Sequence, residues 1–481
     1  MTTLSSDVAT AHLRNIDDLP GPRGLPVVGN LLQMDRQRMH QTVEQWARDY
    51  GPYFRFRLPG RRFLAIADPT ALLAVLRDRP DGFRRSVRFE QAWTELGLPA
   101  GVFGAHGDSW RRQRRMVMAA FDPAHVRAYL PSLVKVTQRL AGRWAKAAKA
   151  GAAIDLQADL MRYTVDAITG LAFGADVNTL ESDDEVIQQH LDKIFPALFN
   201  RLMAPFPIWR YVSTPADKRL AASIVEVKKT IAGFIAQAHG RLNADPARRE
   251  RPANLLEAMI VASQVPASGV DDLDVAGNVM TMLLAGEDTT ANTLAWLVHL
   301  LWRHPEALAA AQEEVRRLAP DPAGYTPESL ASLDYVEACI NETMRLKPVA
   351  PFQAAEALRD TTIADIRVPA GTIVWCAMRS PSLDERNFTD AARFDPQRWV
   401  DESSTAQDAN SAKRVSMPFG GGPRVCPGRY LAMLEMKMAV AMLLGRFDIA
   451  SVDAPTGAEA EERLALTLTP VGLRMTLRER A

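Results

Sequence analysis

The sequence predicts a mainly helical protein with a minor β region, and three observations support this prediction. Most long segments place apolar residues at helical spacing. Strand-like alternation of apolar and polar residues is confined to a few short stretches. One helical pattern continues for about 33 residues, which is unusually long for a globular protein. No internal repeat and no low-complexity tract divides the chain.

The first elements expected along the chain are a stiff segment and a hairpin. Leu19–Pro26 is rich in Pro and Gly, which exclude a helix there. Tyr53–Arg57 and Arg62–Ile66 alternate apolar and polar residues around a short turn, as a β-hairpin does. Arg367–Val374 and Leu464–Leu468 are the other expected strands. Helical periodicity predicts helices over Gln41–Asp49, Ala124–Ala150, Leu156–Phe173, Ala216–Leu242 and Pro305–Leu318.

The longest predicted helix runs from about Asp272 to His304, where Pro305 stops it. At 1.5 Å per residue it would be about 50 Å long, so we expect it to cross the whole molecule. It is apolar on nearly all sides around Met280–Leu284, which predicts burial. Its middle nevertheless reads Ala-Gly-Glu-Asp-Thr-Thr over residues 285–290. Two acids and two hydroxyls inside a buried helix indicate a functional site.

Composition excludes several classes of protein. The 481 residues include 57 basic and 57 acidic side chains, and this balance argues against a nucleic-acid-binding protein. The three cysteines are an odd number in a long chain, which indicates a reducing compartment rather than a disulfide scaffold. The first residues lack the apolar core of a signal peptide, and no apolar stretch approaches the ~18 residues of a membrane span. We expect a cytoplasmic protein with no membrane anchor.

A glycine-rich loop carries the strongest chemical signal. Residues 419–428 read Phe-Gly-Gly-Gly-Pro-Arg-Val-Cys-Pro-Gly and lead into a helical run. Cys426 lies at the beginning of that helix, where the helix dipole favours a thiolate, and a thiolate can ligate iron. An isolated cysteine is more often an inert, buried small hydrophobe. The residues around this cysteine favour the ligand.

The loop resembles the haem-thiolate loop of the cytochrome P-450 family at five positions. These are Phe419, Gly422, Arg424, Cys426 and Gly428. The resemblance covers essentially the whole chain and implies the cytochrome P-450 fold, as a polar tail over residues 1–18 and a single domain over residues 19–481. It implies haem b (iron protoporphyrin IX) between the long helix and the loop, with Cys426 as the iron ligand. Arg424 would meet a haem propionate, and Phe419 would keep water from the sulfur.

The centre of the long helix resembles the (A/G)GxDTT segment that faces haem in the same family. Ala285 and Gly286 would lie against the haem and leave room for dioxygen. Asp288 and Thr289 would be the catalytic pair that delivers protons. The alternative for this motif is that Thr289 bonds back to its own helix while Asp288 pairs elsewhere.

Two further motifs resemble those that hold the haem region together. Trp110 and Arg114 match the WxxxR pattern, which places an indole N–H and a guanidinium on one helical face, ready for propionate carboxylates. Glu342 and Arg345 match the ExxR pair, and Arg398 supplies the later arginine of that triad, for which we expect a structural role.

The match is imperfect in one place, and one charged run is ambiguous. Many family members carry a basic residue for the second propionate where this sequence places Glu356. Either a different residue serves here, or that propionate is held by fewer contacts. Arg111, Arg112 and Arg115 surround the WxxxR pair. They form either a solvated face or a docking surface for an acidic electron donor.

The resemblance implies an oxidoreductase, a soluble bacterial-type cytochrome P-450 monooxygenase. It would use O2 and two electrons, ultimately from NAD(P)H, to insert one oxygen atom into a hydrophobic small molecule by hydroxylation or epoxidation. The electrons would come from an external ferredoxin or flavodoxin and its reductase, because no reductase domain follows Ala481. The segments expected to face substrate are mostly apolar: residues 87–106, 195–209, 280–288, 349–355 and 466–469.

The apolar segments favour a fatty acyl, terpenoid, steroid or other natural-product substrate, and do not choose among them. Two other functions stay open. A peroxygenase would use hydrogen peroxide directly, although it would have less need of Asp288 and Thr289. A non-catalytic haem-thiolate sensor or ligand carrier would leave this pair unexplained.

Overall fold

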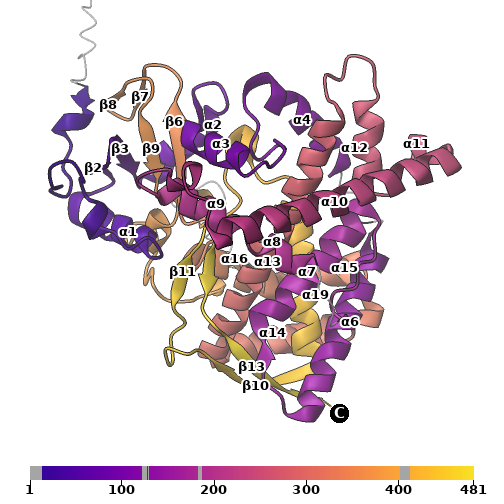
Figure 1. The fold of residues 1–481 in the computed structure, drawn as a ribbon. Helices are drawn as coiled ribbons and strands as arrows, with labels where there is room; N and C mark the ends of the chain where they lie inside the picture. Colours follow the sequence, from indigo (N-terminus) through magenta and orange to yellow (C-terminus); the bar gives the residue numbers. More distant parts are fainter. Residues whose placement is uncertain (1–12, 122–126, 128, 183–186, 401–411, 481) are drawn as a thin grey trace, which may run out of the picture.

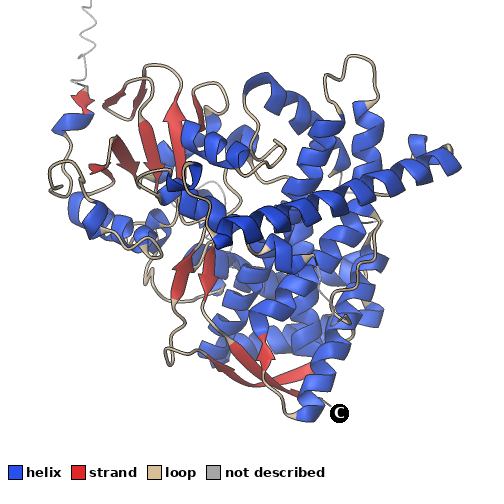
Figure 2. Cartoon of the chain, in the orientation of Figure 1, coloured by secondary structure: helices blue, strands red, loops and turns tan. Residues whose placement is uncertain are grey.

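The computed structural model describes the chain except residues 1–12, 122–126, 128, 183–186, 401–411 and 481. Helices make up most of the described chain, and the strands gather to one side and at the lower end of the view (Figures 1 and 2). The predicted mainly helical fold with a minor β region is confirmed. No helix in this described part combines the length and hydropathy of a membrane span.

The structure gives the following elements. The helices are α1 (Met39–Tyr50), α2 (Pro69–Arg77), α3 (Val87–Glu95), α4 (Gly107–Ala120), α6 (Leu130–Ala150), α7 (Leu156–Phe173), α8 (Gln188–Leu191), α9 (Ile194–Met203), α10 (Pro215–Ala244), α11 (Ala247–Glu250), α12 (Leu255–Ser263), α13 (Asp272–Arg303), α14 (Pro305–Leu318), α15 (Pro327–Ala331), α16 (Asp334–Leu346), α17 (Gln397–Val400), α18 (Ala412–Val415) and α19 (Arg429–Arg446). The strands are β1 (Arg14–Asn15), β2 (Tyr53–Leu58), β3 (Arg61–Ile66), β4 (Phe83–Arg85), β5 (Ile154–Asp155), β6 (Gln353–Ala357), β7 (Thr361–Ile363), β8 (Ile366–Val368), β9 (Ile373–Cys376), β10 (Phe447–Asp453), β11 (Glu462–Leu464), β12 (Leu468–Pro470) and β13 (Arg474–Glu479). The largest sheet has the order β2-β3-β9-β6-β4, and smaller sheets have the orders β1-β8-β7, β10-β13-β5 and β11-β12.

Local capping signals explain where the long helices begin. Asp271 and Asp274 form a capping box at the start of α13, in which each side chain accepts a hydrogen bond from the other residue's backbone N–H. Thr214 and Asp217 do the same for α10. The helix α13 ends before Pro305, as the sequence predicts. Of the predicted helix Ala124–Ala150, residues 130–150 form α6, and residues 124–126 and 128 lie outside the described chain.

Two predicted strands are wrong in detail. The segment predicted at Arg367–Val374 divides into β8 and β9, because Pro369 and Gly371, with φ +80°, form a turn between them. The segment predicted at Leu464–Leu468 is the turn of the β11-β12 hairpin, where Leu466 has φ +83°. Alternation of apolar residues continues through both turns, so the pattern alone does not reveal them.

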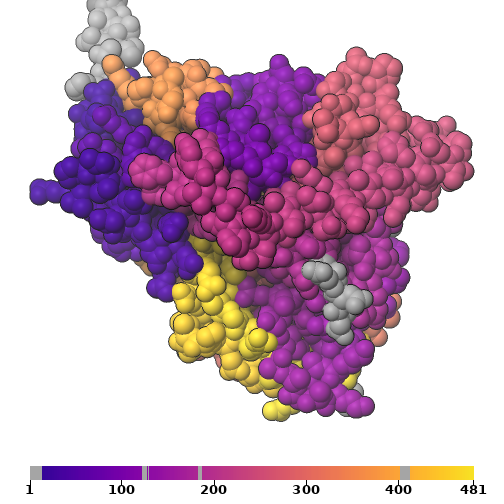
Figure 3. All heavy atoms as spheres, in the orientation of Figure 1, coloured from indigo at the N-terminus to yellow at the C-terminus, as the bar shows by residue number. Residues whose placement is uncertain are grey.

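The helix α13 lies at the centre of the helical region and packs against α7, α10, α12, α16 and α19. Its apolar residues, such as Trp296 and Leu297, are fully buried. Burial contributes about 1.5–3 kcal/mol for each large apolar side chain, which fixes the helix in the core. The segment from α8 to α10 crosses the face of the molecule turned to the viewer (Figure 3). Because α13 traverses the core, the polar residues at its centre can face an internal cavity.

Candidate active site

A cavity of about 310 Å³ lies between α13 and the glycine-rich loop before α19. The loop contributes Phe419 and Cys426 to its wall, and α13 contributes Ala285, Gly286 and Thr289. Side chains from α4 and from the segment after α16 complete the lining. The fold therefore brings the cysteine loop, the WxxxR motif and the centre of the long helix to one cavity.

The cysteine loop depends on a glycine at one position. Gly422 has φ +65°, and a Cβ atom there would lie 2.3 Å from the carbonyl oxygen of Leu76 in α2. This close approach fixes the loop against α2. The backbone N–H of Cys426 donates to the carbonyl of Phe419 over 2.9 Å, which closes the loop just before Gly428 caps α19. The sulfur atom is thus held by a backbone that only glycine permits.

The helix dipole alone does not make Cys426 a thiolate. Burial raises the pKa of the Cys426 thiol, against the backbone N–H of Gly428 and the charges of Arg114 and Arg429, which lower it. The expected thiolate bias is therefore outweighed by desolvation. A bound metal ion deprotonates a coordinating thiol, so the thiolate form of this residue depends on a metal ligand bond.

Four arginines line the same cavity, and no ion pair is described for any of them. They are Arg79, Arg85, Arg114 and Arg424. Burial lowers the pKa of all four guanidinium groups, that of Arg424 to about 9. The Nε atoms of Arg79 and Arg424 are buried without a hydrogen-bond partner. Buried cations without acids are unfavourable, so the site is suited to a ligand that carries carboxylates.

The arginines are held by neutral partners. The Arg424 guanidinium lies 4.6 Å from the centroid of the Trp110 ring, and Arg114 donates to the carbonyl of Val425 over 2.7 Å. Arg85 donates to the carbonyl of Phe103 over 2.9 Å. These contacts orient the donors and leave their charge uncompensated.

His106 shows how strongly positive this region is. Both ring nitrogens lack a hydrogen-bond partner. Burial, and then the charges of Arg424 and Arg85, lower the pKa of His106 to about 4. The imidazole is therefore neutral beside the cavity at neutral pH.

Glu356 does not take part in the cavity. It lies on β6, pairs with Arg84 over 2.9 Å and accepts from the backbone N–H of Val87. Sequence reasoning missed Arg79 and Arg85, two further basic side chains that line the cavity. Arg79 and Arg85 lie in a charged stretch that matches no motif, so only the fold reveals that they line the cavity.

The acid and the alcohol of the long helix are both engaged in hydrogen bonds within the protein. The Thr289 hydroxyl lines the cavity but donates to the Ala285 carbonyl over 2.7 Å. Asp288 accepts from Asn292 over 2.9 Å and from the hydroxyl of Thr467 in the β11-β12 turn. The alternative arrangement considered for this motif is thus the one observed. Asn292 and Thr467 are partners that sequence reasoning did not identify.

The ExxR motif assembles with its third member. Arg345 donates to both carboxylate oxygens of Glu342 at 2.8 Å, and both side chains are fully buried. Arg398 approaches the same carboxylate at 3.4 Å, and the indole of Trp399 donates to it over 2.9 Å. Arg345 also donates to three backbone carbonyls, those of Ser382, Ala391 and Arg393. The network ties the segments before the cysteine loop to α16.

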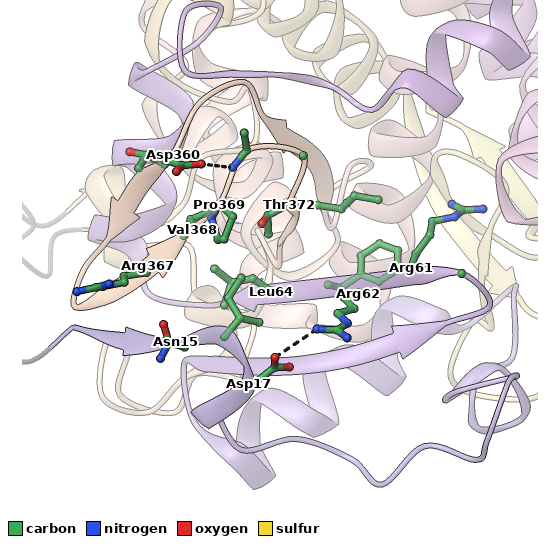
Figure 4. A pocket seen from close by; sticks show the side chains of 17 residues that line it. Asn15, Asp17, Arg61, Arg62, Leu64, Asp360, Arg367, Val368, Pro369 and Thr372 are labelled. Atoms are coloured by element: carbon green, nitrogen blue, oxygen red, sulfur yellow. Dashed lines mark hydrogen bonds and ion pairs between the residues drawn. The ribbon is translucent and has the colours of Figure 1, made fainter.

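A second hollow, of about 800 Å³, lies on the surface between β3 and the β8-β9 turn (Figure 4). Arg61, Arg62 and Arg367 line it together with Asp17 and Asp360. Arg62 and Asp17 pair over 3.2 Å. The groove shares no residue with the internal cavity, and its lining contains no thiol and no histidine. The internal cavity is therefore the candidate active site.

The cavity fits haem on its own features. One thiol at a helix start, two orphaned arginine nitrogens and four guanidinium groups without acids match an iron ligand and a pair of propionates. These are the features of a haem-thiolate protein.

The comparison with known families agrees with this class. The profile of the cytochrome P-450 family matches residues 19–477, and the chain belongs to that family. It is 29% identical over 472 residues to the self-sufficient cytochrome P-450 monooxygenase CYP505E5 of Aspergillus niger, covering 96% of this chain and 43% of that protein. It is 27% identical to the LUTEIN DEFICIENT 5 protein, chloroplastic, of Arabidopsis thaliana, covering 90% of this chain and 72% of that protein. It is 28% identical to cytochrome P-450 94A1 of Vicia sativa, covering 89% and 84%.

One expectation is corrected by these relatives. The chain spans less than half the length of the Aspergillus proteins that it matches, and those proteins are named self-sufficient. The expectation of an external ferredoxin or flavodoxin with its own reductase, which was drawn from the family resemblance, is therefore wrong. The arginines proposed for its docking are also engaged: Arg111 pairs with Asp81 and Asp108, and Arg112 donates to the carbonyl of Gly269 over 2.8 Å.

Proposed function

We propose that this protein is a haem-thiolate monooxygenase that inserts one oxygen atom of O2 into a hydrophobic small molecule. One observation carries the proposal: Cys426, the unpaired arginines and the polar centre of α13 line the same cavity. The names of its relatives, which include monooxygenases, support the same reaction class. Electrons would derive ultimately from NAD(P)H.

The residues that hold haem are assigned by charge and position. Cys426 would ligate the iron, and Trp110, Arg114 and Arg424 would bind one propionate region. Arg79 and Arg85 would bind the remaining carboxylate, because they are the other cations that line the cavity. When bound, the haem would supply the iron at which O2 is activated.

The part of the cavity away from the cysteine would hold the substrate. Val102, Met282, Ala285, Val349 and Ala350 line it, and their side chains are apolar. An apolar wall with few polar groups favours a fatty acyl chain, terpenoid, steroid or similar compound, which would be hydroxylated or epoxidised. Of the segments expected to face substrate, residues 87–106, 280–288 and 349–355 contribute to this lining.

The segment 195–209 does not line the cavity. Phe195 and Phe199 are buried in the core between elements. The Trp209 indole donates to Glu95 over 2.7 Å at the surface, and Phe206 is exposed. The aromatic spacing in this segment therefore reflects packing and surface contacts.

Asp288 and Thr289 would move protons to the cavity. The Thr289 hydroxyl must turn from the Ala285 carbonyl to donate into the cavity, which exchanges one hydrogen bond for another. Asp288 is oriented by Asn292 and Thr467, so it can accept and return a proton without losing its position.

The test of the ligand assignment is spectroscopic. The reduced, haem-loaded protein with carbon monoxide should show the absorption band characteristic of thiolate ligation. Cys426→Ser should abolish the band, whereas Cys339→Ala, a buried cysteine of α16 outside the cavity, should keep it. Persistence of the band in Cys426→Ser would overturn the assignment.

The test of the reaction is the coupling of electrons to product. A shift of the ferric haem spectrum on titration with hydrophobic compounds would identify a substrate. Turnover of that substrate with electrons derived from NAD(P)H should then exceed turnover with hydrogen peroxide alone. Thr289→Ala should lower the product formed per electron, and equal turnover with peroxide would favour the peroxygenase.

A further inference from the structure

The loop between α3 and α4 packs backbone to backbone against α13. A Cβ atom at Gly101 would lie 2.1 Å from the carbonyl oxygen of Gly277, and one at Gly277 would lie 2.8 Å from the backbone nitrogen of Gly101. A larger residue at either position would force the two segments apart. The next residues of the loop, Val102 and Phe103, line the cavity. The loop is therefore part of the cavity wall at the place where it touches α13.

Asn278 ties this loop to α13, one residue after Gly277. Its side-chain oxygen accepts from the backbone N–H of Val102 over 2.9 Å. Its amide nitrogen donates to the side-chain oxygen of Gln113 over 3.0 Å and to the backbone carbonyl of Asp274 over 2.7 Å. Asn278 is fully buried, and these two bonds use both hydrogens of its amide. It therefore acts on the cavity through Val102.

Gln113 of α4 holds the other side of the same loop. Its amide nitrogen donates to the backbone carbonyl of Ala100 over 3.1 Å and to the carboxylate of Asp274 over 2.6 Å. The orientation of both amides follows from these contacts, because the Val102 N–H can only donate and the Ala100 carbonyl can only accept. Buried polar networks whose members are all bonded are rigid, so the two amides fix the loop in one position.

The position of this loop depends on the amide pair rather than on regular secondary structure. Among the described hydrogen bonds, those of Asn278 and Gln113 are the ones that reach the Val102 N–H and the Ala100 carbonyl. An apolar side chain in place of Asn278 would leave the Val102 N–H buried without an acceptor, which is unfavourable. The loop would then have to move away from α13 to find a partner.

The same loop also reaches the cationic part of the cavity. Arg85 donates to the carbonyl of Phe103 over 2.9 Å, and Arg424 donates to the carbonyl of Ala105 over 2.6 Å. Val102 thus lies between two anchors, the amide pair on one side and the cavity arginines on the other. Loss of the amide anchor should displace Val102 while the arginine anchors remain.

We propose that Asn278 and Gln113 determine substrate specificity by fixing the loop against α13, so that Val102 is held in the apolar wall. An apolar group of the ligand then meets a wall at a defined distance from α13. Both amides are positioning residues, since they act through the loop. The inference rests on the proposed function, because it supposes that a hydrophobic ligand occupies the part of the cavity next to Val102.

The first experiment compares two probes that bind the ferric, haem-loaded protein and shift its spectrum. Imidazole tests the iron site alone, whereas N-dodecylimidazole also tests the apolar wall. Asn278→Leu keeps the size of the side chain and removes the amide. It should lower the affinity for N-dodecylimidazole relative to imidazole about four- to fifteenfold, the equivalent of one or two lost methylene contacts. An unchanged ratio of the two affinities would overturn the proposal.

The second experiment tests whether Asn278 acts through Val102. Val102→Ala should lower the same ratio of affinities by a similar factor, because it shortens the wall directly. The double variant Asn278→Leu/Val102→Ala should show no further loss, since both changes remove the same contact. Losses that multiply in the double variant would overturn the proposal, and so would an unchanged ratio in Val102→Ala.

Two further variants separate positioning from lost stability. Gln113→Met keeps the bond to Val102 and removes the donor to Ala100, so it should lower the ratio less than Asn278→Leu does. Asn254→Ala removes a buried amide that caps α12 outside the cavity lining. It should lower the melting temperature and leave the ratio unchanged, and a fall equal to that of Asn278→Leu would overturn the inference. A wild-type protein that shows no spectral shift with imidazole would instead overturn the proposed haem site.

Discussion

Buried arginines occur both in the cavity lining and outside it, and the two groups differ in their partners. Outside the cavity lining, Arg345 pairs with Glu342, and Arg379 pairs with two glutamates. Around the cavity, Arg79 and Arg424 have no acid among the described residues. Burial alone would lower the pKa of Arg379, but its acids raise it, whereas burial lowers the pKa of Arg424 to about 9.

The contrast separates structural charge from binding charge. A buried pair that satisfies itself holds chain segments together and needs no ligand. A buried cation without an acid is tolerated where a ligand supplies the acid. The unpaired arginines therefore mark the binding site, and the paired ones mark its support.

The largest expected effect is on the paired side. Glu342→Gln leaves Arg345 buried without a counter-charge, so the free energy of unfolding should fall by about 3–5 kcal/mol. Chemical denaturation of the haem-free protein measures it. Asp384→Asn, which breaks an exposed pair with Arg386, should change stability by less than about 1 kcal/mol. Equal changes in the free energy of unfolding for Glu342→Gln and Asp384→Asn would contradict the structural role assigned to the buried pair.

A smaller effect of opposite sign is expected on the unpaired side. Arg79→Met replaces a buried cation that has no acid with an apolar side chain of similar length. The haem-free protein should gain about 1–3 kcal/mol in unfolding free energy. The same variant should lose haem faster to an acceptor protein. Arg379→Met, the matched control, should destabilise the protein, and destabilisation by Arg79→Met would contradict the comparison.

The smallest effect concerns the acids: Glu342 pairs with Arg345, whereas no ion pair is described for Asp192, at the C-terminal end of α8. The folded protein holds a proton on Asp192 up to about pH 6, above the ordinary value of about 3.9 for an aspartate. The stability contributed by this proton is present below about pH 4 and is lost as the pH rises through about 6. Since the residue is exposed, the change should be below about 1 kcal/mol. Asp192→Asn should flatten the pH dependence of the melting temperature in this window.

Much of the fold followed from local pattern. Helices α7 and α14 have the predicted boundaries, because capping residues and the prolines mark them in the sequence. The turns inside the predicted strands Arg367–Val374 and Leu464–Leu468 could not be predicted, since apolar alternation runs through them. Motif spacing alone selected Glu342, Arg345 and Arg398, which the fold brings together, and Cys426, which lines the cavity.

The sequence by itself determined the helical class, the long central helix and the candidate iron ligand, because these depend on periodicity and on a closely spaced motif. Only the tertiary structure selected Arg79 and Arg85, directed Glu356 to Arg84 and set Thr467 against Asp288. Each of these is a contact between segments distant in the chain. The charge of a side chain can be read from the sequence, but whether that charge is buried and paired depends on which segments the fold places around it.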